Sequence, residues 1–144
     1  MVRIEAEYLG DLRIRSQHVH SGTELLTDAP LDNQGKGESF SPTDLCATAL
    51  MTCVGTIIGI KARSMDLNVD GFKMFIEKEM SSDSPRRIGK LTGGFEFVTP
   101  VEPRQRESLI RAAKGCPVHH SLHPDIRKVL TFRWADGAVD VVEM

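Results

Sequence analysis

The chain has 144 residues, of which 40% are hydrophobic and 26% charged, and its formal net charge is −2. This length and composition suit one globular domain with a hydrophobic core, which we expect to span residues 1–144. The weak negative charge, with Lys and Arg scattered along the chain, excludes the basic patch expected of a protein that binds nucleic acid or a membrane surface.

The N-terminal residues 1–7 alternate between polar and apolar side chains and lack the apolar core of a signal peptide. The longest uncharged stretch, residues 45–60, is shorter than the ~20 residues needed to span a bilayer. We therefore expect a cytoplasmic protein. The three cysteines are an odd number without a secretory signal, which argues against a disulfide framework and leaves reduced thiols, redox chemistry or metal binding open.

Three short strands are predicted near the N-terminus. Residues 2–8 and 12–18 alternate in hydropathy and flank a turn at Gly10, and residues 23–27 form a third strand. Together they predict an antiparallel meander. Residues 28–40 are rich in Gly, Asp and Asn and contain a Pro, which predicts a loop.

A long helix is predicted after this loop. Ser41 is a suitable N-cap, Pro42 fits the first turn, and Asp44 lies three residues after the cap, where its carboxylate can complete a capping box. We predict a helix over residues 42–64 that is apolar on nearly all sides up to Lys61. Such a helix must be covered on most of its surface, which favours an extensive interface with a second copy of the chain.

The second half of the chain begins with a predicted hairpin. Residues 67–80 and 86–98 carry alternating apolar residues and flank a turn that contains Ser, Asp and Pro. Together they predict a long pair of antiparallel strands. Gly93 and Gly94 predict a β-bulge in the second of these strands.

A second helix is predicted over residues 103–114, with Gly115 as its C-cap. Residues 129–134 and 138–142 predict two final strands. The order of elements is strands, a long helix, strands, a helix and strands. This order indicates an α+β fold rather than a regular alternation of parallel βαβ units.

Two cysteines lie on the predicted long helix. Cys46 and Cys53 are seven residues apart, so they share one helix face with Cα atoms ~10 Å apart, which is too far for a disulfide between them. Free cysteines are commonly small buried residues. Packing is therefore the simple interpretation of both, and more so for Cys46 than for Cys53.

Cys116 has a different setting. Because Pro117 follows it, Cys116 can cap a new helical turn, whose free N–H groups and dipole would favour a thiolate. His119 and His120 add polar or cationic character, whereas an inert thiol at the end of a helix is the competing interpretation. Cys116 with His119, His120 and His123 also offers ligand types that suit zinc, but this spacing is not specific for a metal site.

Two segments around these cysteines resemble a known family. Ser41–Leu45, together with the Ala- and Cys-rich stretch that continues to Cys53, resembles the first signature of the OsmC/Ohr family. Gly115–Leu122 resembles the second signature, around the family's other cysteine. The order of elements matches over essentially the whole chain, and the divergent subgroup of OsmC-like redox proteins is the most similar. The resemblance implies an intertwined homodimer, in which antiparallel sheets that mix strands of both chains wrap around long central helices and two sites lie at the interface.

The resemblance also implies a mechanism. In active members of the family the first cysteine attacks a hydroperoxide, becomes a sulfenic acid and condenses with the second cysteine to a disulfide, which an external dithiol reduces. Cys53 would then be the peroxidatic residue and Cys116 the resolving one, and no cofactor is expected. Because burial in the middle of a helix raises the pKa of a thiol, Cys53 needs an activating cation.

The family supplies this cation as an Arg from the N-terminal region, oriented by a Glu near the start of the helix. Arg13 and Arg15 share one face of a predicted strand, and we expect Arg13 to fill the role because it lies closer to the preceding turn. The position that matches the Glu is Thr43, which has no charge. Asp44 is next to it, and Glu38 in the upstream loop is the expected substitute. Arg13 and Glu38 as ordinary solvated residues remain the alternative.

The resemblance therefore implies a thiol-dependent peroxidase with an organic hydroperoxide as substrate and a dithiol as reductant. The uncharged Thr43 argues against efficient turnover. A non-enzymatic redox-sensing or ligand-binding dimer is the alternative, and a metal site built from cysteine and histidine is a third hypothesis.

Overall fold

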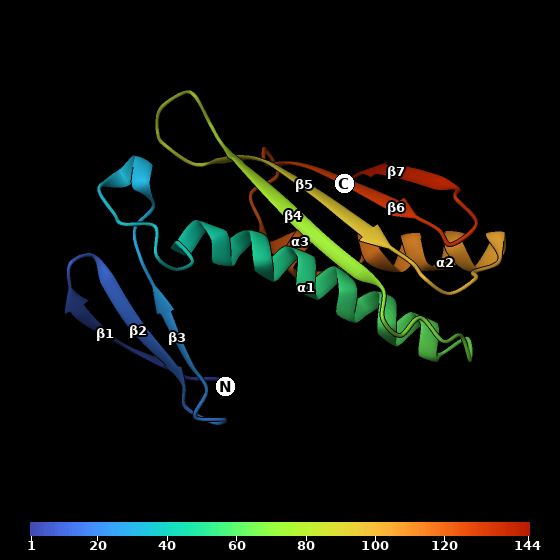
Figure 1. Ribbon diagram of the computed structural model, residues 1–144, viewed down its shortest axis with the longest axis horizontal. Helices are drawn as coiled ribbons and strands as arrows, with labels where there is room; N and C mark the ends of the chain where they lie inside the picture. The colour runs from blue at the N-terminus through green and yellow to red at the C-terminus, as the bar shows by residue number, and fades with distance from the viewer. The chain divides into compact units, whose positions relative to one another are not determined.

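The computed structural model describes residues 1–144, which form two compact units, Met1–Cys46 and Ala47–Met144 (Figure 1). The first unit holds a three-stranded sheet and the loop that follows it. The second holds a four-stranded sheet, most of a long helix and two shorter helices. The α+β class expected from the order of elements is confirmed.

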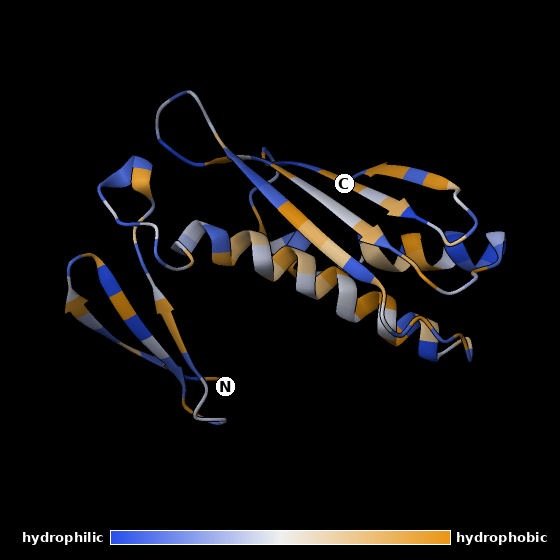
Figure 2. Cartoon of the chain, in the orientation of Figure 1, coloured by the Kyte–Doolittle hydropathy of each residue, from blue (hydrophilic) through white to orange (hydrophobic).

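The sheet of the first unit is an antiparallel meander of β1 (Ile4–Gly10), β2 (Arg13–His18) and β3 (Glu24–Thr27), as predicted. At the turn between β1 and β2, Gly10 has a φ of 89°, which glycine adopts without strain. Apolar and polar side chains alternate along most of β1, whereas β3 has two adjacent leucines (Figure 2). Many of the apolar ones are exposed in the single chain: Ile4, Tyr8, Leu9, Leu12, Ile14, Leu25 and Leu26.

Residues 28–40 form the predicted loop, which contains one short 3-10 helix, η1 (Leu31–Asn33). Gly35 lies so close to the backbone of Ala29 that a side chain at this position would overlap it. The N–H of Gly37 donates to the carbonyl of Ala29 at 3.2 Å. The loop is therefore closed by contacts within its own backbone.

The long helix α1 (Pro42–Arg63) begins at the cap that the sequence predicts. The hydroxyl of Ser41 accepts the N–H of Asp44 at 3.1 Å, and the carboxylate of Asp44 accepts the N–H of Ser41 at 2.8 Å. This reciprocal capping box satisfies two backbone N–H groups at the start of the helix.

By length and composition alone, α1 could cross a membrane. This is weak evidence, because the core helix of a water-soluble protein has the same properties. One face of α1 is part of the core of the second unit, through Ala47, Leu50, Val54, Ile58 and Ala62.

The second sheet has the strand order β4 (Lys73–Met80), β5 (Ile88–Glu96), β6 (Arg127–Arg133) and β7 (Val139–Glu143). β4 pairs with β5, and β6 with β7, as antiparallel neighbours. The predicted hairpin and the two predicted final strands are thus confirmed.

The predicted bulge at Gly93 and Gly94 is wrong. Both glycines keep regular pairing with β4, and the irregular register lies between Glu79 and Met80. Close packing explains why a glycine occupies position 94, because a Cβ atom on Gly94 would overlap the ring of Phe75.

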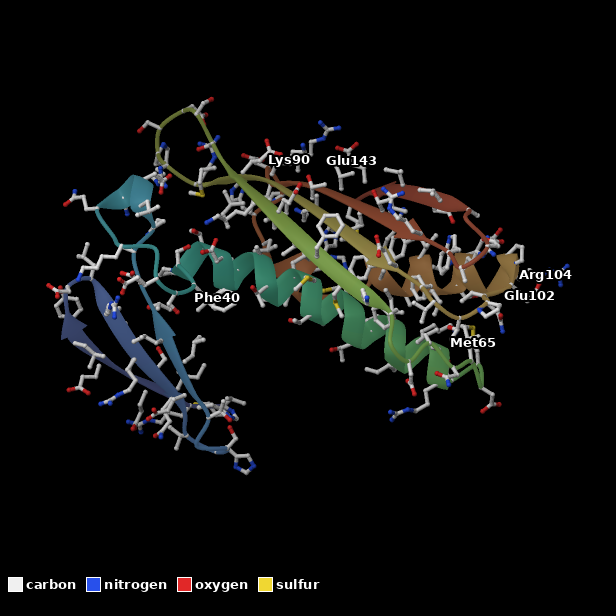
Figure 3. All side chains as sticks on the ribbon, in the orientation of Figure 1. Phe40, Met65, Lys90, Glu102, Arg104 and Glu143 are labelled. Atoms are coloured by element: carbon white, nitrogen blue, oxygen red, sulfur yellow. The ribbon has the colours of Figure 1, made fainter.

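One strand pairing differs from the antiparallel arrangement that we expected: β5 and β6 are parallel. Parallel neighbours need a long crossover connection, and α2 (Pro103–Lys114) and α3 (Pro117–Ser121) lie within it. Figure 3 labels Glu102 and Arg104 at the beginning of α2. Cys116 lies in the same crossover, between the two helices.

Side chains from the sheet and the helices together form the core of the second unit. Phe95 on β5 stacks on Phe132 on β6, with ring centroids 5.3 Å apart, and Phe97 stacks on Trp134 at 4.5 Å. Leu109 on α2 is fully buried in the same cluster. This core holds α1 and the crossover helices in place around Cys116.

Candidate functional site

Cys53 and Cys116 lie next to each other in the second unit. Cys53 is half-buried in the middle of α1, whereas Cys116 is fully buried at the N-cap of α3. Both are free cysteines, and their side chains lie close enough together for Cys53 to raise the pKa of Cys116. The structure thus brings together the two cysteines that the two sequence signatures contain.

Cys116 has a raised pKa. Burial is the largest cause, and the neighbouring thiol of Cys53 raises the pKa further, whereas the backbone N–H groups of His119 and Val118 lower it. The cost of removing the charged thiolate from water is larger than the stabilisation that the backbone N–H groups at the start of α3 give it. The helical turn thus favours the charged form, as expected, but burial outweighs it, so Cys116 stays a thiol.

In the first unit, Arg13 at the start of β2 forms an ion pair with the carboxylate of Glu38 in the loop. A second acid, Asp28, follows β3 directly. Its Oδ2 atom lies 3.9 Å from Nη2 of Arg13 and accepts the N–H of Glu38 at 3.0 Å. The exposed fractions of the side chains are 28% for Arg13, 1% for Asp28 and 60% for Glu38. These three residues, the Arg13 cluster, pair one guanidinium with one buried and one exposed carboxylate.

Arg15, the other candidate for the activating cation, has a different partner. It lies on the same strand as Arg13, but its guanidinium pairs with the carboxylate of Glu7 on β1 at 2.6 Å, and both side chains are exposed. Of the two arginines that the sequence offers, Arg13 is the one paired with Glu38.

At the start of α1, the hydroxyl of Thr43 lies 3.1 Å from that of Ser41. The carboxylate of the neighbouring Asp44 accepts the N–H of Ser41. Thr43, at the position of the family's Glu, and its neighbour Asp44 therefore both contact Ser41 in the helix cap.

The histidines after Cys116 give no support to the zinc hypothesis, because no group of three or more His, Cys, Asp or Glu side chains could hold a metal ion. His119 has a lowered pKa, first because of burial and then because of the charge on Lys128. Lys128 is itself buried and donates to the carbonyl of Ile126 at 2.8 Å. These side chains hold the segment after α3 in place.

The cysteine pair and the Arg13 cluster belong to different units. Cys53, Cys116, Arg13 and Glu38 were all identified from the sequence, whereas Asp28 was missed. The sequence offered a weak signal for it, since an acidic residue occupies the first position after a predicted strand.

The family model of OsmC-like proteins matches residues 35–129 of the chain, a range that includes Glu38 and both cysteines of the pair. No curated protein gives a significant match.

Several solved structures have the same fold. A protein of Psychrobacter arcticus 273-4, provisionally described as an osmotic stress induced and detoxification response protein, is 41% identical over 92% of this chain and 96% of that chain, with a TM-score of 0.88. An organic hydroperoxide resistance protein OsmC of Legionella pneumophila is 16% identical over 92% and 96%, with a TM-score of 0.74. A Vibrio cholerae protein, provisionally described as an organic hydroperoxide resistance protein and with captopril bound in one of the active sites, is 15% identical over 96% and 94%, with a TM-score of 0.73.

Proposed function

Because the chain belongs to the OsmC-like protein family, we propose that it is a thiol-dependent peroxidase that reduces organic hydroperoxides. The observation that carries this proposal is that half-buried Cys53 and fully buried Cys116 lie side by side, close enough for Cys53 to raise the pKa of Cys116. Two proteins of the same fold are described as organic hydroperoxide resistance proteins, which supports the substrate class.

The proposed cycle has three steps. The thiolate of Cys53 attacks the distal oxygen of the hydroperoxide, the O–O bond breaks, and the alcohol leaves after taking up a proton, so that Cys53 becomes a sulfenic acid. The sulfur of Cys116 then attacks the sulfur of Cys53, which forms a disulfide and releases water. An external dithiol reduces this disulfide and is itself oxidised to a disulfide. All electrons come from thiols, so these steps need no cofactor.

Burial supports this division of roles. Cys53 is the more exposed cysteine of the pair and can be reached by a peroxide, whereas Cys116 is 0% exposed. The raised pKa of Cys116 keeps it protonated, and a thiol that donates a hydrogen bond stabilises negative charge on Cys53. Cys53 is therefore the peroxidatic cysteine of the proposal and Cys116 the resolving one.

Arg13 supplies the activating cation in this proposal. A guanidinium stabilises both a thiolate and the charge that develops on the leaving oxygen. Glu38 orients Arg13 through their ion pair. Glu38 thus takes over the role that the family assigns to an acid at the position of Thr43.

The proposed enzyme is an intertwined homodimer with its sites at the interface. Tyr8 and Ile14 in the first sheet are exposed in the single chain, as is Ile60 on α1. Burial of such surface stabilises an interface by about 25 cal/mol per Å². An apolar interface site would favour organic hydroperoxides over hydrogen peroxide. We place the enzyme in the cytoplasm, where thiols are kept reduced.

A turnover assay with cumene hydroperoxide and dithiothreitol tests the proposal. We expect the wild-type protein to consume peroxide over many cycles and the Cys53→Ser variant to consume none. Cys46→Ser is the matched control, since Cys46 is an exposed cysteine on the same helix, and it should keep the wild-type rate. Undiminished consumption by the Cys53→Ser variant would contradict the assignment.

A redox-sensing or ligand-binding dimer is the second candidate, and the two acids beside Arg13 favour it. When Asp28 and Glu38 are both ionised, the Arg13 cluster has a net negative charge, which stabilises a thiolate less than a lone arginine does. A sensor would form the Cys53–Cys116 disulfide once, with the loss of two hydrogens, and would not turn over with the dithiol. Sustained turnover decides in favour of the peroxidase.

A further inference from the structure

Asp28 is a buried acid to which neither the sequence signatures nor the proposed cycle assigns a role. We propose that its carboxylate positions Arg13, so that the guanidinium keeps its place when the exposed carboxylate of Glu38 moves away. The catalytic consequence of this role rests on the proposed peroxidase function, whereas the contact itself does not. Asp28 is a positioning residue, because it acts through Arg13 and not on the substrate.

The geometry places Asp28 at the centre of the loop contacts. Its side chain is 1% exposed, and its Oδ2 atom accepts the N–H of Glu38 at 3.0 Å and lies 3.9 Å from Nη2 of Arg13. Its own N–H donates to the carbonyl of Phe40 at 3.1 Å. Phe40 is the labelled residue shortly before α1 in Figure 3. Asp28 therefore joins the end of β3, the end of the loop and Arg13.

A buried carboxylate is unfavourable unless hydrogen bonds and a cation compensate its charge. Asp28 has one hydrogen bond from Glu38 and the guanidinium of Arg13 beside it, while its Oδ1 atom has no hydrogen-bond partner. The Nε atom of Arg13 is also buried without a partner. With these atoms unsatisfied, the attraction between the two opposite charges is the main compensation for the burial of Asp28.

Glu38 holds Arg13 in a different way. Its side chain is 60% exposed, and ion pairs in contact with water contribute little because water and salt screen the charges. Asp28 is in a less polar environment, where the same charges attract each other more strongly. The buried acid therefore sets the place of the guanidinium, and the exposed acid adds a contact that can break and re-form.

The first experiment tests the contact without any peroxide, by thermal unfolding. Arg13→Met removes the cation and leaves the buried charge of Asp28 with only the hydrogen bond from the N–H of Glu38, so this variant should melt below the wild type. Adding Asp28→Asn removes the uncompensated charge at the same side-chain volume, so the double variant should melt above Arg13→Met. If Asp28→Asn lowers the melting temperature equally in both backgrounds, the two side chains are not coupled and the proposal is wrong.

The second experiment measures kcat and KM for cumene hydroperoxide with dithiothreitol. Asp28→Asn should lower kcat/KM about 10-fold to 100-fold, which is the effect expected for one lost interaction with a charged group, and mainly through kcat. In the Arg13→Met background the same substitution should have no further effect. Glu7→Gln is the matched control, because Glu7 pairs with Arg15 in the exposed part of the same sheet, and its kinetics should equal those of the wild type.

Together, the two experiments distinguish a failure of the positioning role of Asp28 from a failure of the proposed peroxidase function. Thermal coupling between Arg13 and Asp28 in a protein without turnover would support the positioning contact and refute the peroxidase. Turnover that Asp28→Asn leaves unchanged, together with additive melting temperatures, would refute the positioning role and support the peroxidase.

Discussion

The buried thiol of Cys116 lies next to Cys53, and both its burial and this neighbouring thiol raise the pKa of Cys116. The two residues come from α1 and from the crossover between β5 and β6, so the pair depends on tertiary structure. Chemistry at this pair starts with Cys116 protonated and shielded from solvent.

Alkylation should distinguish the three cysteines. A brief treatment with iodoacetamide near neutral pH should label Cys116 more slowly than Cys53 or Cys46, because the reagent attacks the thiolate and Cys116 is buried and protonated. Mass spectrometry of the digested protein measures each site, and the exposed Cys46 is the internal control. Equal labelling of Cys116 and Cys46 would show that the thiol is not shielded.

Replacement of Cys116, the resolving cysteine of the proposed cycle, should stop that cycle after its first step. Without added dithiol, we expect Cys116→Ser to consume one equivalent of hydroperoxide and then to hold Cys53 as a sulfenic acid, because no neighbouring thiol can condense with it. Dimedone traps the sulfenic acid, and the adduct at Cys53 can be located by mass spectrometry. Wild-type turnover in the Cys116→Ser variant would rule out Cys116 as the resolving residue.

Loss of an aromatic ring from the core should destabilise the fold. Phe132 is 0% exposed and stacks on Phe95, so Phe132→Ala should lower the free energy of unfolding by about 3–5 kcal/mol. Val141→Ala on β7 is the control, since Val141 is 67% exposed and its truncation should change the free energy by less than about 0.5 kcal/mol. Urea unfolding measures the free energy of unfolding of both variants. A similar decrease in the two would show that Phe132 is not part of the stabilising core.

The stability of the protein should depend on pH through His119. Its folded-state pKa lies below the ordinary 6.5, first because of burial and then because of the charge on Lys128. As the pH falls below 6.5, the unfolded chain takes up a proton that the folded chain does not, so the free energy of unfolding decreases until the folded pKa is passed. The stability from this histidine is therefore fully present only above that window.

His119→Gln should flatten this part of the stability profile. The measurement is the urea midpoint between pH ~8 and ~5, the range in which histidines titrate. His20→Gln, in an exposed part of the chain, should keep the wild-type slope. An unchanged slope in the His119→Gln variant would assign the pH dependence to another group.

Much of the fold could be predicted because local patterns determine it. The helix predicted over residues 103–114 agrees with α2, because Pro103 and Gly115 mark its two ends. The strand predicted from residue 67 begins only at Lys73. Gly71 has a φ of 82° and forms a turn there, and the hydropathy pattern alone does not indicate that turn.

Features that depend on distant segments could not be predicted in this way. The alternation of side chains in β5 and β6 does not encode the direction of a neighbouring strand, which depends on where the crossover returns. Asp28 is an ordinary loop acid in the sequence, and its burial beside Arg13 follows only from the folded loop. Cys53 and Cys116 could be identified because each lies within a local signature.

The parallel pairing of β5 with β6 has a consequence for the newborn chain. Cys53 leaves the ribosome well before Cys116, and the hairpin of β4 and β5 can close while the crossover is still being synthesised. β6 can join the sheet only after the whole crossover has emerged, because distant pairing must wait for the connecting segment. During this interval Cys53 lacks its neighbour Cys116. The cysteine pair is therefore completed late in synthesis, only after the crossover that carries Cys116 has emerged.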